Sequence, residues 1–327
     1  MKKFINSFED LVRDSVAGLV MAHEDLLAPN ESPLFVCRRT PKANRVALIS
    51  GGGSGHELLH TGYVGPGMLD AACPGEVFTA PTPDQIVAAA RRVEAGQGVL
   101  MIVKNYAGDT ASFQMAADML DMDCATVLVN DDVAVDSSVR TTGRRGVAGT
   151  LIVEKMIGAA AEAGADLYEC KALGNRVNGS TASMGVALSS CIVPEAAAPT
   201  FEIGPSEIEV GVGIHGEPGR HRQRLVPADD IVTLLLEPIL KDLGLAAGRE
   251  VLLHVNGFGG TPLMELYLLN RLATQRLQAL GFTVRRWLVG NHTTSLEMAG
   301  ASLTVTALDD ELLRLWDASV TTPSLRW

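Results

Sequence analysis

Short apolar runs alternate with longer segments of helical period along the whole chain, and this alternation restricts the fold more than any other feature. Eight runs have the length and composition of β-strands, and polar or glycine-rich segments separate them from the helical stretches. They are residues 45–50, 98–104, 125–130, 184–191, 207–214, 250–256, 283–290 and 302–308. The pattern predicts an α/β fold in which helices cover β-sheets.

Helices are predicted in the intervals between these runs. One covers residues 8–22, and another begins after Thr82, because residues 82–85 read Thr-Pro-Asp-Gln and match a capping box with proline in the first helical position. A long alanine-rich helix is predicted over 147–163. It ends at Gly164 and is followed by a further helix that ends near residue 177.

We expect two α/β domains, each a mixed β-sheet covered by helices, with a boundary between residues 182 and 183. The helices before this point complete one set of alternating elements, and a new series of strands follows. The predicted domains are therefore residues 1–182 and 183–327. Within the second domain, the runs 184–191 and 207–214 are expected to pair with each other.

Charge and cysteine content exclude several classes of function. Lysine and arginine total 27 against 38 aspartate and glutamate, which gives 27 − 38 = −11. A chain this acidic, without a long basic run, is not expected to bind nucleic acid or an anionic membrane. Five scattered cysteines without a C-x-x-C spacing argue against a disulfide framework and a cysteine-rich zinc site. A cytoplasmic location is expected, since the first residues lack the apolar core of a signal peptide.

A glycine-rich segment, Gly-Gly-Gly-Ser-Gly-His-Glu at residues 51–57, follows the first apolar run. Either it is a tight turn between a strand and a helix, or its glycines let the backbone approach a small polar ligand. It matches neither phosphate-loop consensus. Residues 56–60 read His-Glu-Leu-Leu-His, the zinc-protease pattern, but we expect no metal site because no third ligand is evident.

Two further strand ends carry side chains that could take part in chemistry. Lys104 ends an apolar run and Asp109 follows five residues later. Lys104 could mark the exit of the strand while Asp109 caps a helix that begins near Thr110, or the two could orient a hydroxyl and accept its proton. His215 lies in an Ile-His-Gly-Glu-Pro-Gly segment, where the small neighbours leave space around the imidazole for a structural or a nucleophilic role.

Taken together, these segments resemble the dihydroxyacetone kinase family, and in particular its ketose-binding subunit. The similarity includes ALISGGGSGHE, IVKNYAGD, GRRGVAGT and GVGIHGEPG, in the family's order. The matching segments are residues 47–57, 60–69, 71–86, 102–109, 130–135, 143–150, 211–219 and 260–267. They span nearly the whole chain.

The resemblance implies a mechanism for the candidate residues. His215, in the C-terminal domain, would add through a ring nitrogen to the C2 carbonyl of a short ketose and form a covalent hemiaminal. In the N-terminal domain, Lys104 and Asp109 would bind the ketose hydroxyls, and Asp109 or His56 would take the proton during phosphoryl transfer. The glycine-rich substrate loop, Gly53, Ser54, Gly55 and His56, would line the pocket.

The resemblance also implies partners. No cofactor or metal is expected on this chain, whereas ADP or ATP and Mg²⁺ would be held by a separate, all-helical nucleotide-binding subunit. That subunit would be recharged from phosphoenolpyruvate through a phosphotransferase-system donor subunit, or by free ATP. A homodimer is expected. Two alternatives stay open: a ketose-binding co-activator or sensor without kinase activity, and a kinase for a related ketose such as erythrulose.

Overall fold

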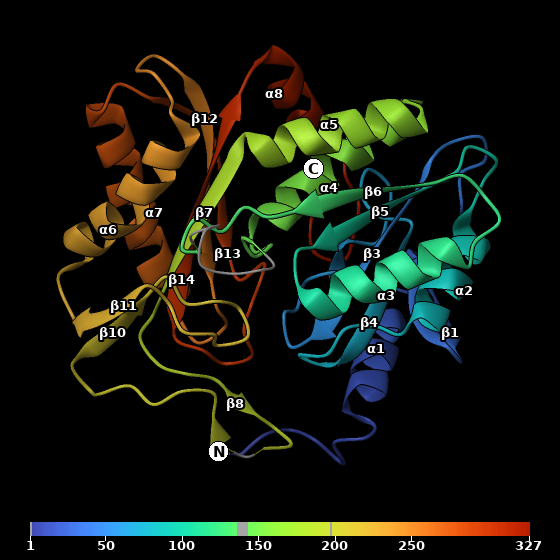
Figure 1. Ribbon diagram of the computed structural model, residues 1–327, viewed down its shortest axis with the longest axis horizontal. Helices are drawn as coiled ribbons and strands as arrows, with labels where there is room; N and C mark the ends of the chain where they lie inside the picture. Colours follow the sequence, from blue (N-terminus) through green and yellow to red (C-terminus); the bar gives the residue numbers. More distant parts are fainter. Residues whose placement is uncertain (1, 136–142, 197) are drawn as a thin grey trace. The chain divides into compact units, whose positions relative to one another are not determined.

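The chain forms two compact units, each assembled from segments that are distant in the sequence. The computed structural model describes residues 2–135, 143–196 and 198–327 (Figure 1). One unit, which we call the Lys104 unit, contains Lys2–Val129, Thr150–Arg176 and Leu312–Trp327. The other, the His215 unit, contains the described residues of Asn130–Gly149 and Val177–Glu311.

These units differ from a single division at residue 182. The chain passes from one unit to the other between Arg176 and Val177, close to the expected position. In addition, the described residues of Asn130–Gly149 belong with the C-terminal strands, and Leu312–Trp327 belongs with the N-terminal ones. Domain membership follows tertiary packing, and a boundary drawn from the order of elements misses segments that return to an earlier unit.

The Lys104 unit is built on a six-stranded mixed sheet, as the α/β prediction requires. Its strand order is β1-β2-β4-β3-β5-β6. The pairs β3–β4, β3–β5 and β5–β6 are parallel, and β1–β2 and β2–β4 are antiparallel. The strands are β1 (Leu27–Glu31), β2 (Leu34–Arg38), β3 (Ala47–Ser54), β4 (Ala71–Val77), β5 (Val99–Lys104) and β6 (Cys124–Val129). Strands β1, β2 and β4 were not predicted from the sequence. Proline and polar residues interrupt the apolar pattern of β1 and β4, and β2 is a run of only five residues.

Helices lie on both faces of this sheet, with α2 and α3 on one side and α4 and α5 on the other (Figure 1). The helices are α1 (Leu11–Ala22), α2 (Pro83–Val93), α3 (Ala107–Asp118), α4 (Gly149–Glu162), α5 (Leu167–Gly179) and α8 (Asp310–Asp317). The predicted capping box is confirmed at Thr82, whose hydroxyl accepts from the backbone N–H of Gln85 while the Gln85 side chain accepts from Thr82 N–H.

Alternation along β3 and β5 determines which residues each helical layer covers. Ala47 and Ile49 of β3 pack with Met101 and Val103 of β5 in the apolar core under α2 and α3. Successive side chains of a strand point to opposite faces. Ser50 and Lys104 therefore point away from α2 and α3, toward the side on which α4 lies.

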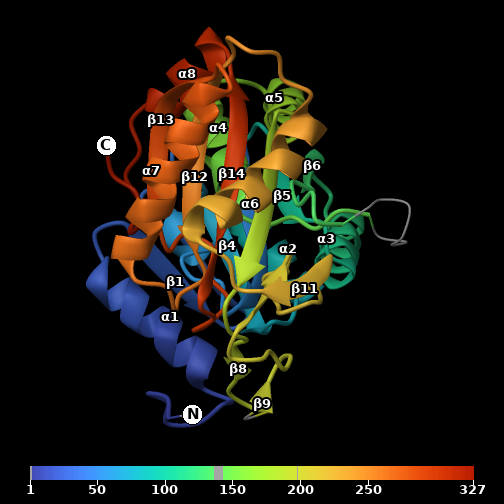
Figure 2. The ribbon, with the colours of Figure 1, turned by 90° about the vertical axis from the view of Figure 1, so that its left-hand side faces the viewer.

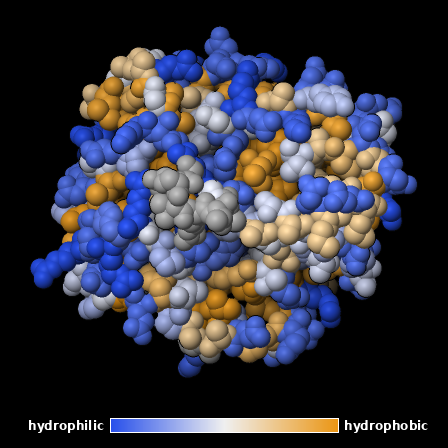
Figure 3. Space-filling view, viewed as in Figure 1, coloured by the Kyte–Doolittle hydropathy of each residue, from blue (hydrophilic) through white to orange (hydrophobic). Residues whose placement is uncertain are grey.

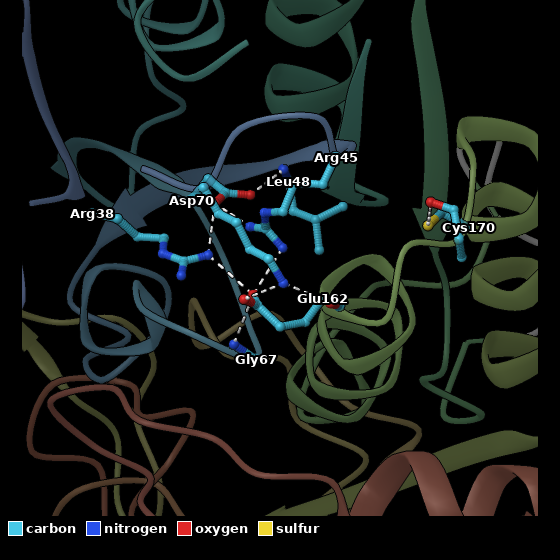
Figure 4. A network of polar contacts seen from close by, with 9 residues as sticks. Arg38, Arg45, Leu48, Gly67, Asp70, Glu162 and Cys170 are labelled. Atoms are coloured by element: carbon cyan, nitrogen blue, oxygen red, sulfur yellow. Dashed lines mark hydrogen bonds and ion pairs between the residues drawn. The ribbon is translucent and has the colours of Figure 1, made fainter. Parts of the chain in front are cut away.

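A charged network holds the C-terminal end of α4 against the sheet of the Lys104 unit (Figure 4). Arg38 Nη1 lies 3.1 Å from both Asp70 Oδ1 and Glu162 Oε2, and Arg45 makes ion pairs with the same two carboxylates. Both arginines are buried. Because a buried charge is costly without a partner, these pairs tie the helix to β2 and to the start of β3.

The His215 unit has its own six-stranded sheet, in the order β11-β10-β7-β14-β12-β13. Only β12 and β13 are parallel. The expected pairing of the runs 184–191 and 207–214 is confirmed, since β10 pairs with β7. The strands are β7 (Thr181–Ala187), β10 (Glu207–Val210), β11 (His221–Arg224), β12 (Glu250–Gly257), β13 (Thr283–Gly290) and β14 (Gly300–Leu308), and β8 (Ile192–Val193) pairs with β9 (Ala198–Pro199).

The two faces of this second sheet have different chemistry. Helices α6 (Ala228–Leu243) and α7 (Leu263–Ala279) cover the apolar face (Figures 1 and 2), where Leu253 and Leu303 lie in the core. On the opposite face, Ser183 Oγ and Thr304 Oγ1 are 2.7 Å apart, both buried. The apolar runs of the sequence therefore supply one packed face and one hydrogen-bonded face.

The molecular surface carries hydrophilic residues with smaller apolar groups between them on the face seen in Figure 3. Within residues 2–135, 143–196 and 198–327, no helix has both the length and the hydropathy that crossing a membrane requires.

Candidate functional site

The glycine-rich segment completes strand β3 and does not form a turn between a strand and a helix. Gly51, Gly52 and Gly53 all belong to β3. A Cβ at Gly51 would lie 2.6 Å from the carbonyl oxygen of Cys73, and one at Gly53 would lie 2.6 Å from the backbone nitrogen of Thr79. A Cβ at Gly52 would collide with the ammonium of Lys104. The glycines therefore let other groups approach the backbone of β3 closely.

The loop after β3 is shaped by its own hydrogen bonds. Ser54 Oγ donates to the carbonyl oxygen of Gly75 at 2.7 Å, and the carboxylate of Glu57 accepts from Gly55 N–H at 3.0 Å. Gly55 has φ = 101°, a conformation that glycine adopts readily. The described backbone passes through turns from Gly55 to His60 and then forms a short 3-10 helix, Thr61–Tyr63.

His56 is buried, which excludes its interpretation as an exposed polar residue of a turn. Its ring stacks on Phe78 with the centroids 5.0 Å apart and the planes 15° from parallel. The zinc-protease pattern at residues 56–60 does not lie on a helix. Among the residues that the structure describes, no group of three or more His, Cys, Asp and Glu side chains is placed to hold a metal ion.

Lys104 and Asp109 meet at the end of β5. Lys104 is 1% exposed and does not mark an exit of the strand into solvent. Its Nζ donates to the carbonyl oxygen of Gly51 at 3.3 Å and lies 3.5 Å from Asp109 Oδ2. Asp109 is also buried and lies in the first turn of α3, whose N-cap is Tyr106, so the alternative in which Asp109 caps a helix that begins near Thr110 is wrong. The structure brings the two predicted hydroxyl-binding residues together.

Two residues that the sequence analysis did not assign lie behind Lys104. His60 Nε2 is 2.7 Å from Lys104 Nζ, and His60 Nδ1 is 2.6 Å from Glu154 Oε1 on α4. Ser50 Oγ, 3.0 Å from His60 Nδ1, donates to the carbonyl oxygen of Ile102. His60 was visible in the sequence only as half of a rejected metal pattern, and no local signal marked Glu154.

Burial has the largest effect on the pKa values of His60 and Glu154. It lowers the pKa of His60 well below 6.5, and the neighbouring charges of Lys104 and His56 lower it further. Burial also raises the pKa of Glu154 to about 8, although the charge of Lys104 and the hydrogen bond with Ser50 act in the opposite direction. His60 is therefore neutral at pH 7, and Glu154 titrates close to physiological pH.

His215 belongs to the His215 unit, whereas Gly53, Ser54, Gly55, His56, Lys104 and Asp109 all belong to the Lys104 unit. It lies five residues beyond β10, in a loop and not at the end of the strand. Its Nδ1 is 3.0 Å from Glu217 Oε1, and its backbone N–H donates to Glu217 Oε2 at 2.9 Å. Glu217 therefore fixes both the backbone and the ring of His215.

Glu217 carries a negative charge at neutral pH. Burial raises its pKa, but the hydrogen bond and charge of His215, together with the charge of Arg145, outweigh burial and lower the pKa to about 2. A Cβ at Gly213 would collide with both Glu217 and Arg145, so this glycine lets them approach the backbone. The sequence placed Glu217 two residues after His215, a signal that could have identified it.

Two other segments of the resemblance, residues 130–135 and 143–150, make hydrogen bonds with each other and with the His215 loop, which is the stretch between β10 and β11 (residues 211–220). Asp132 Oδ2 accepts from Arg145 Nε at 2.7 Å, and Arg145 Nη2 donates to the carbonyl oxygen of Gly211 at 2.8 Å. Asp131 accepts from Val147 N–H at 2.8 Å and from the Gly149 N–H at 2.7 Å. These contacts join residues 130–135 to residues 143–150 and to the start of the His215 loop.

The comparisons with known proteins cover nearly the whole chain. Residues 17–324 match the Dak1 domain model. A protein of Listeria innocua named the dihydroxyacetone-binding subunit DhaK of a PTS-dependent dihydroxyacetone kinase is 50% identical over 314 residues, which are 95% of each chain.

Two solved structures have the same fold. A dihydroxyacetone kinase of C. freundii superimposes with a TM-score of 0.91 at 34% identity, over 99% of this chain and 60% of that one. A dihydroxyacetone kinase operon co-activator, DhaQ, gives 0.89 at 32% identity, over 95% and 96% of the two chains. The chain therefore belongs to the Dak1 domain family, the family of the dihydroxyacetone-binding subunits of dihydroxyacetone kinases.

Proposed function

We propose that this chain is the dihydroxyacetone-binding subunit of a dihydroxyacetone kinase. It would bind the ketose covalently on His215 and present a terminal hydroxyl for phosphorylation to dihydroxyacetone phosphate. The observation that supports this proposal most directly is the Glu217–His215 pair, because a carboxylate on Nδ1 is the arrangement that prepares the other ring nitrogen as a nucleophile.

The covalent step follows from that pair. The lone pair of His215 Nε2 would attack the C2 carbonyl carbon, and the π electron pair of the C=O bond would pass to the oxygen. That oxygen would take up one proton from solvent to become the hemiaminal hydroxyl, which balances the proton that the ring gives up from Nδ1. The ring gains positive charge as the C–N bond forms, and the charged carboxylate of Glu217 on Nδ1–H would stabilise it or accept that proton. Glycerol, which has no carbonyl, cannot form this bond.

Lys104 and Asp109 would recognise a hydroxyl group of the ketose. Their charged atoms are 3.5 Å apart, the longest of the contacts described for the ammonium. A hydroxyl can accept from an ammonium and donate to a carboxylate at the same time. A ketose hydroxyl between the two side chains would therefore use both groups, and Gly53, Ser54, Gly55 and His56 would line the rest of the pocket.

Phosphoryl transfer requires a base near the terminal hydroxyl. Asp109 is one candidate, since its carboxylate faces the ammonium of Lys104. His56 is the other, with its ring held against Phe78. Removal of a general base typically lowers the rate by ~10²- to 10⁴-fold, so the two candidates can be separated by substitution.

The phosphoryl donor would be held by a partner of this chain. ADP or ATP with Mg²⁺ would be bound by a nucleotide-binding kinase subunit, which a phosphotransferase-system subunit would recharge from phosphoenolpyruvate. The name of the Listeria relative, a subunit of a PTS-dependent kinase, supports that donor for the present chain. A homodimer and a cytoplasmic location belong to the same proposal.

The test is ³¹P NMR of the products formed from equal amounts of dihydroxyacetone and erythrulose. The mixture contains this chain, a cognate nucleotide-binding subunit, and either ATP or the complete phosphoenolpyruvate relay. We expect phosphorylated dihydroxyacetone only when both the chain and the partner are present. A larger yield of erythrulose phosphate would change the assigned substrate.

A ketose-binding co-activator is the second candidate, because the DhaQ structure shares the fold over almost its whole length. This chain retains His56, Lys104, Asp109 and His215, the groups that a kinase subunit would use. Ketose binding by this chain without product from either donor, in the presence of a partner that is active with another ketose-binding subunit, would establish the co-activator function and reject the kinase.

A further inference from the structure

We propose that His60 and Glu154 are positioning residues for the ketose hydroxyl site. They form a buried hydrogen-bonded relay with Lys104 that holds the ammonium in place, fixes His60 in its Nδ1–H tautomer and transmits the ionisation of Glu154 to Lys104. Where it concerns the ketose, this inference rests on the proposed function; the relay itself is a property of this chain alone.

The hydrogen bonds of Lys104 determine the tautomer of His60. An ammonium has three donors and no acceptor. The three acceptors around Nζ are the carbonyl oxygen of Gly51, the carboxylate of Asp109 and Nε2 of His60. His60 Nε2 must therefore present a lone pair, and the proton of the neutral ring lies on Nδ1, where it is donated to Glu154 Oε1 at 2.6 Å.

The three side chains of the relay are buried, so each depends on the others for hydrogen bonds. Lys104, His60 and Glu154 are 1%, 5% and 0% exposed. Each charged group would be costly in such surroundings without a partner at hydrogen-bond distance. The relay also comes from three different elements, β5, the turn before the 3-10 helix and α4, so it forms only when the Lys104 unit is folded.

Other titratable groups surround the relay. Asp109 faces Lys104, and His56 contributes to the electrostatics of His60. Tyr63, fully buried, has its pKa raised by burial and also by Glu154. None of the three lies between Lys104 and His60, or between His60 and Glu154, because those two separations, 2.7 and 2.6 Å, are direct hydrogen bonds.

Glu154, at the end of the relay, changes its ionisation within a pH range in which the protein can be studied. With a pKa of about 8, Glu154 changes charge between roughly pH 7 and 9. Its Oε2 has no hydrogen-bond partner in the described structure, so ionisation is not compensated by another donor at that atom. The negative charge is instead compensated through His60 by Lys104, which strengthens the hold on the ammonium.

The first experiment reads the tautomer on this chain alone, without ketose or partner. The chain is labelled with ¹⁵N-histidine, and ¹H–¹⁵N correlations of the ring nitrogens are recorded from pH 6 to 9. The His60 signals are those absent from His60→Gln or, should that variant not fold, those that move most in Glu154→Gln. We expect a protonated Nδ1 and an unprotonated Nε2 throughout. A protonated Nε2, or a cationic ring at pH 6, would overturn the inference.

The second experiment measures how ketose affinity depends on pH, by calorimetric titration of this chain with dihydroxyacetone. Wild type should bind more tightly at pH 9 than at pH 7. Glu154→Gln keeps an acceptor for His60 but cannot ionise. It should therefore lose the gain in affinity between pH 7 and pH 9, and bind dihydroxyacetone roughly tenfold more weakly than wild type at pH 9. The matched control is Thr150→Val, one turn earlier on α4, where a buried hydroxyl has no hydrogen-bond partner.

The outcomes separate the relay from the proposed function. If Thr150→Val follows wild type and Glu154→Gln loses the difference between pH 7 and 9, the relay acts on the ketose site. An identical pH dependence in Glu154→Gln and wild type would reject that action. If no ketose binds to any variant, the proposed function fails, and the tautomer measurement still decides whether the relay exists.

Discussion

Glu217 accepts hydrogen bonds from both the backbone and the ring of His215, at 2.9 Å and 3.0 Å. The carboxylate is kept charged by its hydrogen bond with His215 and by Arg145, in spite of burial. His215 therefore has a fixed ring orientation before any ligand arrives. Preorganisation of this kind lowers the cost of forming a covalent bond, since little has to move.

Glu217→Gln should reduce hemiaminal formation on His215 about tenfold, because the amide preserves the shape of the contact but cannot compensate positive charge on the ring. The measurement is the tetrahedral ¹³C signal of dihydroxyacetone labelled at C2. Glu202→Gln, which removes an exposed carboxylate from the same unit, is the control. In His215→Ala the signal should disappear, and its persistence there would reject His215 as the nucleophile.

Gly52→Ala should weaken ketose binding by about tenfold or more, since the new Cβ would occupy the position of the Lys104 ammonium. The affinity for dihydroxyacetone is measured by calorimetry, and folding is checked by circular dichroism. Gly18→Ala, in α1 with no atom near its added Cβ, should bind normally and be more stable by roughly 0.5–1 kcal/mol. Unchanged affinity in Gly52→Ala would remove Lys104 from the binding site.

Asp109→Asn should slow phosphoryl transfer by ~10²- to 10⁴-fold while ketose binding is largely kept, if Asp109 is the base. His56→Asn tests the other candidate in the same assay, the rate of the reconstituted kinase with saturating ketose. The variant with the larger loss identifies the base. Asp118→Asn, at the far end of α3, controls for a change of helix charge and should leave the rate unchanged.

Glu154→Gln should stabilise the protein increasingly as pH rises. The pKa of Glu154 is raised from 4.5 to about 8 in the folded chain, so the folded state favours the protonated acid. The stability that this preference gives wild type is fully present below pH 4.5 and is lost as pH rises to about 8. The glutamine of the variant does not titrate and therefore does not undergo this loss. Urea unfolding at pH 5 and pH 9 measures the difference. A stability difference between variant and wild type that is independent of pH would show that Glu154 does not titrate in this way.

Local sequence patterns were sufficient wherever a structural role depends on neighbours in the chain. The capping box at Thr82 required only the residues 82–85, and it formed as predicted. The apolar run that became β5 was recognisable because a strand buried on both faces needs continuous apolar side chains. Strand β4 was missed because Pro74 and Gly75 interrupt the pattern, although its neighbours keep it within the sheet.

Some residues of the candidate site were predicted from the sequence and others were not, again because local patterns report only on neighbours in the chain. Lys104, Asp109 and His215 stand at the ends of apolar runs or in small-residue turns, which are visible in the sequence. His60 looked like part of a metal pattern, and Glu154 looked like one acid in an alanine-rich helix. The contact that joins them spans 94 residues of the sequence, which no periodicity encodes.

The sequence by itself determined the α/β class, most strands, the capped helix and the family to which the chain belongs. Only the tertiary structure decided that Leu312–Trp327 and the described residues of Asn130–Gly149 pack in units built mainly from distant segments, and that His60 and Glu154 lie behind Lys104. The physical reason is the range of the forces. Strands, caps and turns depend on nearby residues, whereas a buried charge depends on whichever side chains the completed packing brings to it.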